Sequence, residues 1–426
     1  MIRSIPINPG ATPLGYLTQR PFVLAWGPSA FPARLPSAFF SILSCWLLLL
    51  TCNVLLMPRK VGVIAAGIFM SLPSQFRYAT EGRPYAEALC FSVLSMLVFI
   101  AWLRRPTLFL GFAYVLSVTA ALYTQPYAAL APCGAVIYVA VRKIKDRVWR
   151  PALACLMLLA IPGILFLPWY FFASETWARG VVVGRFHFNW TSSLPLDFIK
   201  GISGGSFLCS AALICLALLG VSLNLSTRSF GPAKPCEAEP PALLLSASGF
   251  VLVGVLAVDA ARGYFFASRQ ILFALPALSI LAALGLCGAW ARNKAVAIAL
   301  GIWLLATSLW NDVSYQTHFK EDWVSAAHAV AMAAQQGYCL KMADDESLAF
   351  YGVFVPDLHA NLCGALMLYP KVAVISSLYT DSVKLNAARL ELQRHGFVLR
   401  GTGTDGGTTI AFEERANPDF GQKIAP

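Results

Sequence analysis

The stretch 75-QFRYATEGRPYAE-87 places four charged side chains between two segments that are apolar enough to lie in lipid. The flanking segments are 61-VGVIAAGIFMSL-72 and 88-ALCFSVLSMLVFIAWL-103. Pro84 cannot continue a helix from upstream, but it suits the first position of a new one. Gly82 permits backbone angles that other residues avoid. We therefore predict that one helix ends within this stretch, the chain reverses tightly, and a second helix begins at Pro84.

The composition indicates a membrane protein. The chain has 426 residues, of which 58% are hydrophobic and 12% are charged, and its mean hydropathy is +0.66. Soluble domains are about a quarter charged, and a helix needs about 20 mostly apolar residues to cross a bilayer. The sequence thus predicts an α-helical polytopic membrane protein with about ten transmembrane helices. The predicted spans cover residues 36–57, 61–78, 84–103, 107–124, 126–141, 151–172, 205–223, 242–261, 270–290 and 294–311.

The net charge of +11 does not indicate a nucleic-acid partner, because Lys and Arg collect in the cytoplasmic loops of membrane proteins. With ten spans, alternate loops hold 13 and 7 basic residues. We place the richer set in the cytoplasm and predict a multi-pass protein of the inner (plasma) membrane, in contact with membrane lipids. The stretch 75–87, the loop 173–204, the turn 259–269 and the tail after residue 311 are then outside.

Three regions follow from these boundaries. Residues 1–35 are Pro-rich and too short to span, so we expect an outer interfacial segment with one or two short helices. Residues 36–311 form the transmembrane domain, and residues 312–426 form a small extracytoplasmic α/β domain. In that domain we expect helices over 320–337, 345–354 and 381–396 and strands over 338–343, 371–376, 397–401 and 408–414.

Cysteine and histidine indicate no metal site. None of the eleven Cys residues forms a C-x-x-C pair, and most lie in apolar spans, where Cys behaves as a small hydrophobic residue. Cys339 and Cys363 lie in the outer tail and could form a disulfide. The five His residues are scattered without zinc-site spacing, so we expect structural roles for them.

Two arginine-bearing helix starts are predicted on the outer face. Arg83 stands beside the predicted helix start at Pro84, and Arg269 and Gln270 stand at the outer start of the span that begins at residue 270. Helix N-termini favour anions through their unpaired N–H groups and the helix dipole. The pair of sites would therefore suit a phosphorylated lipid.

A simpler explanation stays open. Arg77 and Glu81 are four residues apart, the spacing at which opposite charges pair along a helix. Arginine near the end of a span can also extend its charge to the membrane surface. Charges at span ends say less about function than charges deep in the membrane.

The run 73-PSQFRYATEGRPYAEAL-89 resembles the Pro-x(3)-x-Tyr-x(2)-Glu-x-Arg-Pro-Tyr signature of bacterial membrane glycosyltransferases. These are the family 39-like enzymes of the GT-C fold, relatives of protein O-mannosyltransferases and aminoarabinose transferases. Further stretches resemble the family's elements in the same order, over about residues 10–330: 12-TPLGYL-17, 33-ARLPSAFFSIL-43, 122-LYTQPYAAL-130, 265-FFASRQILFALPAL-278 and 320-KEDWVSAA-327.

The resemblance implies an enzyme, an inverting hexosyl- or pentosyltransferase, that takes a sugar from a polyprenyl-phosphate donor on the outer leaflet. The acceptor would be a hydroxyl of a lipid, glycan or protein. A hydroxyl is a poor nucleophile without a base, and the departing lipid phosphate needs cationic stabilisation. The resemblance implies no firm cofactor and leaves a divalent cation open.

The resemblance also assigns roles to individual residues. Glu81 stands at the acid of the motif and is the candidate base, although the guanidinium of Arg83 beside it stabilises the carboxylate anion and weakens it as a base. The candidates for the donor phosphate are Arg83, Arg269, Arg262 and Arg77, and Tyr85, Gln270, Pro13 and Tyr16 would line the site. In the loop 173–204, Trp177, Phe186, His187, Phe188 and Trp190 could stack on a sugar or anchor the loop at the interface.

The departures from the family pattern matter for activity. The family carries its usual acid in the first outer loop, whereas this chain has no Asp or Glu before Glu81. The family's first-loop His is Ala11, and its Tyr-Thr-His turn has Gln125 in place of the His. We expect either that a first transmembrane helix and its acid are missing from this sequence, or that the protein is a non-catalytic donor-binding or assembly protein. A transporter of lipid-linked sugars is a third possibility, but it should need polar residues deep in the spans.

Overall fold

The computed structural model divides the chain between Val313 and Ser314 into a helical unit and a mixed α/β unit. The structure describes residues 12–27, 30–183, 192–226, 240–262, 266–319, 323–343, 351, 358–364, 368–376, 382–405 and 408–415.

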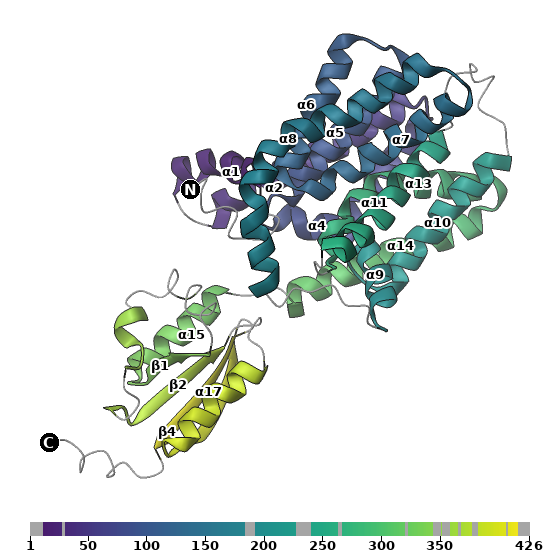
Figure 1. The fold of residues 1–426 in the computed structure, drawn as a ribbon. Helices are drawn as coiled ribbons and strands as arrows, with labels where there is room; N and C mark the ends of the chain where they lie inside the picture. The colour runs from purple at the N-terminus through teal and green to yellow at the C-terminus, as the bar shows by residue number, and fades with distance from the viewer. Residues whose placement is uncertain are drawn as a thin grey trace. The chain divides into compact units, whose positions relative to one another are not determined.

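The helical unit is a bundle of long helices interrupted at several points by short, irregular ones (Figure 1). Its elements are α1 (Pro13–Trp26), α2 (Ala30–Val54), α3 (Arg59–Ser71), α4 (Pro73–Thr80), α5 (Tyr85–Arg104), α6 (Leu108–Thr124), the 3-10 turn η2 (Pro126–Ala129), α7 (Leu130–Lys145), α8 (Trp149–Val183), α9 (Leu194–Ser203), α10 (Phe207–Ser226), α11 (Pro240–Arg262), α12 (Ser268–Ile271), the 3-10 turn η3 (Leu272–Ala274), α13 (Leu275–Arg292) and α14 (Lys294–Ser314).

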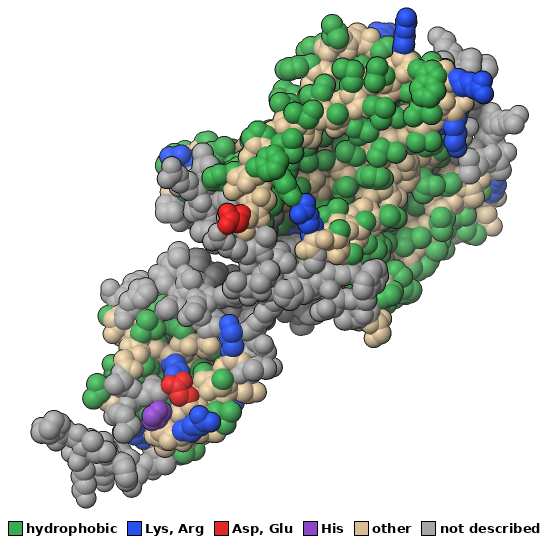
Figure 2. Space-filling model, in the orientation of Figure 1, with side chains coloured by type: hydrophobic (Ala, Val, Ile, Leu, Met, Phe, Trp, Pro, Cys, Tyr) green, Lys and Arg blue, Asp and Glu red, His purple; other side chains and the backbone are tan. Residues whose placement is uncertain are grey.

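Seven helical stretches within the described residues are long and apolar enough to cross a membrane. They are Phe31–Val54, Tyr85–Arg104, Pro126–Lys145, Trp149–Glu175, Pro240–Arg262, Ser268–Arg292 and Lys294–Thr317. The bent pair α9–α10 brings the number to eight, and α6 is a shorter apolar helix. Hydrophobic side chains cover most of the visible face of this unit (Figure 2), as expected of a surface in contact with lipid tails. The predicted fold class, a multi-pass α-helical membrane protein with a small C-terminal α/β domain, is confirmed.

Helices occupy all ten predicted segments, but several differ from the predicted spans in length and continuity. The predicted span 61–78 is two helices, α3 and α4, because Leu72 has an extended backbone between them. Pro73 follows it, and the residue before a proline avoids the helical conformation. Helix α9 meets α10 at a bend of 69°, where Gly204 adopts a left-handed φ of +75°. Helix α2 begins at Ala30, inside the region predicted to be interfacial.

Helices α10 and α13 cross at a close contact. Helix α13 belongs to the most buried of the candidate spans, whereas α8 and α14 are largely exposed. Two glycines face each other at the crossing. A Cβ on Gly285 would lie 2.0 Å from the carbonyl oxygen of Leu216, and a Cβ on Gly220 would lie 2.0 Å from that of Leu281. Glycine therefore permits a backbone approach that any other residue would prevent.

The α/β unit contains a four-stranded sheet in the order β1-β2-β4-β3. Its elements are the π turn η4 (Tyr315–Phe319), α15 (Trp323–Gln335), β1 (Cys339–Met342), the 3-10 turn η5 (Leu358–Asn361), β2 (Lys371–Ser376), α17 (Ser382–Arg394), β3 (Phe397–Asp405) and β4 (Thr408–Arg415). Strands β1 and β2 are parallel, and β4 is antiparallel to both β2 and β3.

The two helices of this unit cover opposite faces of the sheet. Side chains alternate along β2, so that Ala373 and Ile375 pack with α15 whereas Val372 and Val374 pack with α17. The four predicted strands and the helices near 320–337 and 381–396 are confirmed. The predicted helix 345–354 lies almost wholly outside the described residues.

A disulfide joins Cys339 of β1 to Cys363, which follows η5. The possible pairing of these cysteines is thus confirmed. Disulfides persist in oxidising compartments, which agrees with the predicted outer location of this unit.

Candidate functional site

The last turn of α4 and the four residues that join α4 to α5 form a compact group, which we name the charged turn (residues 77–84). The Arg77 Nε lies 2.8 Å from the Glu81 Oε1, and the Arg83 Nε lies 4.0 Å from the Glu81 Oε2. Helix α5 begins at Tyr85, and Pro84 is its N-cap rather than its first residue. The predicted reversal is present, and so is the ion pair that the simpler explanation requires.

Helix α1 packs against the charged turn. The Gln19 side chain donates to the Gly82 carbonyl at 2.8 Å. The Thr18 hydroxyl donates to the Glu87 carboxylate at 2.7 Å. Contact is so close at Gly15 that a Cβ there would lie 2.2 Å from the Cβ of Pro84. The charged turn is therefore fixed from the side of α1.

The predicted lining residues of α1 lie on this helix but differ in their surroundings. Pro13 is buried. Tyr16 belongs to an aromatic cluster with Tyr123 of α6 and with Trp169 and Trp177 of α8. Trp177 thus packs within the bundle, whereas Phe186, His187, Phe188 and Trp190 lie outside the described residues.

The second arginine-bearing segment meets the charged turn at α12. The side chain of Tyr78 lies close enough to that of Ser268 to interact with it, and Arg269 is the next residue of α12. The rings of Tyr78 and Tyr85 lie 5.0 Å apart. Two stretches almost 200 residues apart in the sequence therefore meet at one end of the bundle.

Helix α9 lies against both segments. The ring of Phe198 is 5.3 Å from that of Phe266, just before α12. At the end of α9, a Cβ on Gly204 would lie 1.8 Å from the hydroxyl of Ser74 in α4. We name the region formed by the charged turn, α1, α9, α12 and η2 the polar end of the bundle.

Not every predicted phosphate ligand lies beside α12. Arg262 is exposed, and its guanidinium donates to the hydroxyl of Tyr170 in α8 at 2.5 Å while stacking over that ring at 5.5 Å. The structure thus joins Arg77, Glu81, Arg83 and Tyr85 to the segment of Arg269 and Gln270. It places Arg262 on the surface of α8.

A buried carboxylate that the sequence interpretation missed lies beside Arg269. Asp259, in the last turn of α11, is fully buried. Its Oδ1 accepts hydrogen bonds from the hydroxyl of Tyr127 in η2 and from the Gln270 Nε2, the latter at 3.2 Å. The sequence feature that could have identified Asp259 was its position as an acid inside the predicted span 242–261.

Glu87 is a second buried carboxylate at the polar end. It is 3% exposed, and its Oε1 has no hydrogen-bond partner among the described residues. Glu87 belongs to the stretch 75–87, but the sequence did not indicate that Thr18 of α1 donates a hydrogen bond to it. No group of three or more His, Cys, Asp and Glu side chains that could hold a metal ion occurs in the described part of the chain.

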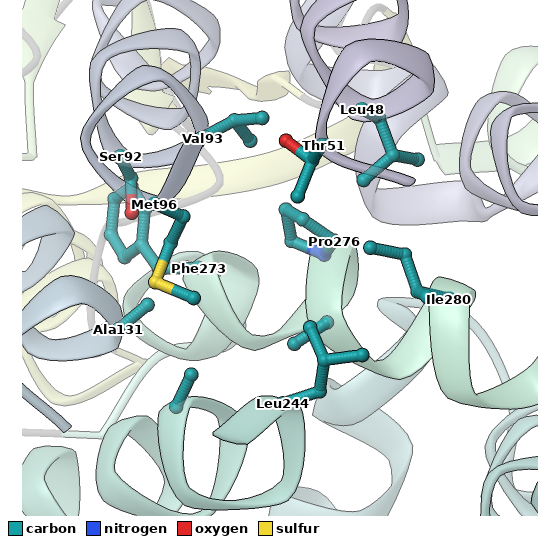
Figure 3. A pocket seen from close by; sticks show the side chains of 12 residues that line it. Leu48, Thr51, Ser92, Val93, Met96, Ala131, Leu244, Phe273, Pro276 and Ile280 are labelled. Carbon is teal, nitrogen blue, oxygen red and sulfur yellow. The ribbon is translucent and has the colours of Figure 1, made fainter. Parts of the chain in front are cut away.

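A small pocket lies among α2, α5, α7, α11, η3 and α13. Figure 3 shows side chains such as Leu48, Met96, Phe273 and Ile280 around it. Its few polar groups include Thr51, whose hydroxyl donates to the Leu47 carbonyl at 2.8 Å. Such a lining suits neither a sugar nor a phosphate.

Comparison with known proteins identifies the fold. No protein-family model matches the chain, and no curated protein matches it significantly. Two solved structures are similar over 94% of this chain and 87% of theirs, at 13% sequence identity. They are ArnT from Cupriavidus metallidurans bound to undecaprenyl phosphate, with a TM-score of 0.55, and the same protein in the apo state, with a TM-score of 0.53. The predicted GT-C fold of membrane glycosyltransferases is thereby confirmed.

Proposed function

We propose that this protein transfers a sugar from a polyprenyl-phosphate donor to a hydroxyl of a lipid, glycan or protein. The observation that carries the proposal is the meeting of the charged turn with α12 at one end of a GT-C fold. This meeting gathers Arg77, Arg83 and Arg269 at the polar end. ArnT, which has the same fold, was solved with undecaprenyl phosphate bound.

The polar end has the chemistry that a lipid phosphate requires. The Arg83 side chain is 55% exposed, and its contact with Glu81 is 4.0 Å long. A phosphate can therefore approach its guanidinium. Arginine binds phosphate through charge-assisted and often bidentate hydrogen bonds. As the sugar leaves, negative charge develops on the phosphate, and fixed guanidinium groups stabilise that charge.

The α/β unit is proposed to be extracytoplasmic. The Cys339–Cys363 disulfide supports this placement, because such bonds persist in an oxidising compartment. The site is proposed to face the outer leaflet, because the loops on the opposite side of the membrane carry more Lys and Arg.

A second candidate function is donor binding without catalysis. Glu81 accepts a hydrogen bond from the Arg77 Nε at 2.8 Å, so this carboxylate is already engaged. In that state Glu81 orients Arg77 rather than an acceptor hydroxyl. A protein that binds the lipid donor for another enzyme would have this arrangement.

Transfer of radiolabelled sugar separates the two functions. Purified protein in lipid vesicles is supplied with a polyprenyl-phosphate hexose and a membrane extract, and label is counted in lipid, glycan and protein fractions. The proposal expects transfer by the wild type and a loss of about 100-fold in Arg269→Ala, since a fixed charge at the leaving group contributes a few kcal/mol. Arg105, at the far end of α5, provides the matched control Arg105→Ala. Donor binding without any transfer would favour the second function, and equal transfer by Arg269→Ala would contradict the first.

A further inference from the structure

Asp259 connects two breaks in the membrane helices. Tyr127 lies in η2, the 3-10 turn between α6 and α7, and Gln270 lies in α12, which runs through η3 into α13. Both side chains donate to the same carboxylate oxygen of Asp259. One buried acid of α11 therefore joins the start of α7 to the start of α13.

The orientation of Gln270 is fixed from both sides. Its Oε1 accepts a hydrogen bond from the backbone N–H of Ala267 at 2.6 Å, so its Nε2 must point to Asp259. This bond closes the first turn of α12. The backbone that carries Arg269 is thus held through Gln270 by Asp259.

Burying the Asp259 carboxylate costs free energy, because few groups solvate its charge at this position. Asp259 is fully buried, and its Oδ2 has no hydrogen-bond partner among the described residues. Buried charges in membrane segments are expensive and are retained for function. The Arg269 guanidinium is close enough to interact electrostatically with this carboxylate.

We propose that Asp259 is a positioning residue that holds the start of α12 and aims Arg269 at the donor phosphate. The proposal rests on the proposed function of the site, which it deepens. Substitution of Asp259 should have two opposite effects on donor binding. Removing a negative charge near a phosphate should tighten binding, whereas releasing Arg269 should weaken it.

Two substitutions separate these effects. Asp259→Asn removes the charge but keeps an oxygen that can accept from Tyr127 and Gln270. Asp259→Ala removes both the charge and the acceptor. Positioning predicts that Asp259→Asn binds a polyprenyl-phosphate hexose at least as tightly as the wild type, and that Asp259→Ala binds it about tenfold more weakly. Native mass spectrometry of the detergent-purified chain measures both, with Asp312→Ala as a control at another acid in an apolar helix.

Hydrogen exchange provides a readout that needs no donor. In Asp259→Ala the amides of residues 266–274 should exchange about tenfold faster than in the wild type, because the bonds that close α12 are weakened. Asp259→Asn and Asp312→Ala should leave them unchanged. Unchanged exchange in Asp259→Ala, or tighter donor binding in both Asp259 variants, overturns the proposal. If the wild type binds no donor, the proposed function is wrong. The exchange rates of the amides in residues 266–274 then test by themselves whether Asp259 holds the start of α12.

Discussion

Replacing Gly285 by alanine tests the helix crossing that fixes α13, and with it the segment of Arg269. The new Cβ would lie 2.0 Å from the Leu216 carbonyl oxygen of α10, and contacts below 3.0 Å are essentially never seen. The two backbones must therefore separate by at least about 1 Å. Because the obstacle is backbone, no side-chain rotation can relieve it.

The cost follows from this displacement. Overpacking of a tight core costs about 1–3 kcal/mol, and a gap of about 1 Å forfeits up to about half of the dispersion energy of the atoms around it. Alanine in place of glycine returns about 1 kcal/mol through helix propensity. We therefore expect Gly285→Ala to lower the free energy of unfolding by about 1–2 kcal/mol.

Unfolding of the detergent-purified chain by denaturant measures this change. Gly249 of α11 is the matched control, because a Cβ there would meet no atom within 4 Å. Gly249→Ala should be neutral or slightly stabilising, and Gly220→Ala should destabilise as much as Gly285→Ala because the two contacts are reciprocal. If Gly285→Ala were as stable as Gly249→Ala, the close crossing of α10 and α13 would be refuted.

Three further outcomes are expected. A membrane-impermeant maleimide, added to intact cells after an impermeant reductant, should label Cys339 and Cys363. This labelling should be lost in the double Cys→Ser variant, and its absence in the wild type would put the α/β unit inside. A hydrogen bond from Lys371 lowers the pKa of Glu414. Its contribution to stability is therefore complete above about pH 5 and disappears as the pH falls through the lowered pKa. Melting temperatures of the wild type and Glu414→Gln should accordingly differ at neutral pH and converge as the pH falls below the lowered pKa of Glu414, and a constant difference would contradict this. Gly15→Ala should push α1 off the charged turn and speed hydrogen exchange in residues 12–27, whereas unchanged exchange would mean that α1 is not docked there.

Local patterns predicted most of the architecture. Long apolar runs located the membrane helices, and the short apolar run over Lys371–Ser376 located a strand. The break at Leu72–Pro73 was also readable in principle, because proline restricts the residue before it. The break was nevertheless missed, because residues 61–78 are long and apolar enough for one span and hydropathy does not distinguish one helix from two.

The candidate site was predictable only in part, because its geometry depends on contacts between distant segments. The arginines near Pro84 and at residue 269 stood out by charge and by their place at helix starts. Asp259 did not, because a single acid within an apolar run resembles a loop residue until Tyr127 and Gln270 are brought to it. The docking of α1 was equally hidden, since it depends on the absence of a side chain at Gly15.

Donor binding tests most directly whether the polar end binds a lipid-linked phosphate. Native mass spectrometry would compare the wild type, Arg269→Ala, Arg83→Ala and the control Arg105→Ala with a polyprenyl-phosphate hexose. The account predicts binding by the wild type and Arg105→Ala and a loss of at least about tenfold in each of the other two variants. Absence of binding, or binding that neither Arg269→Ala nor Arg83→Ala weakens, would contradict it.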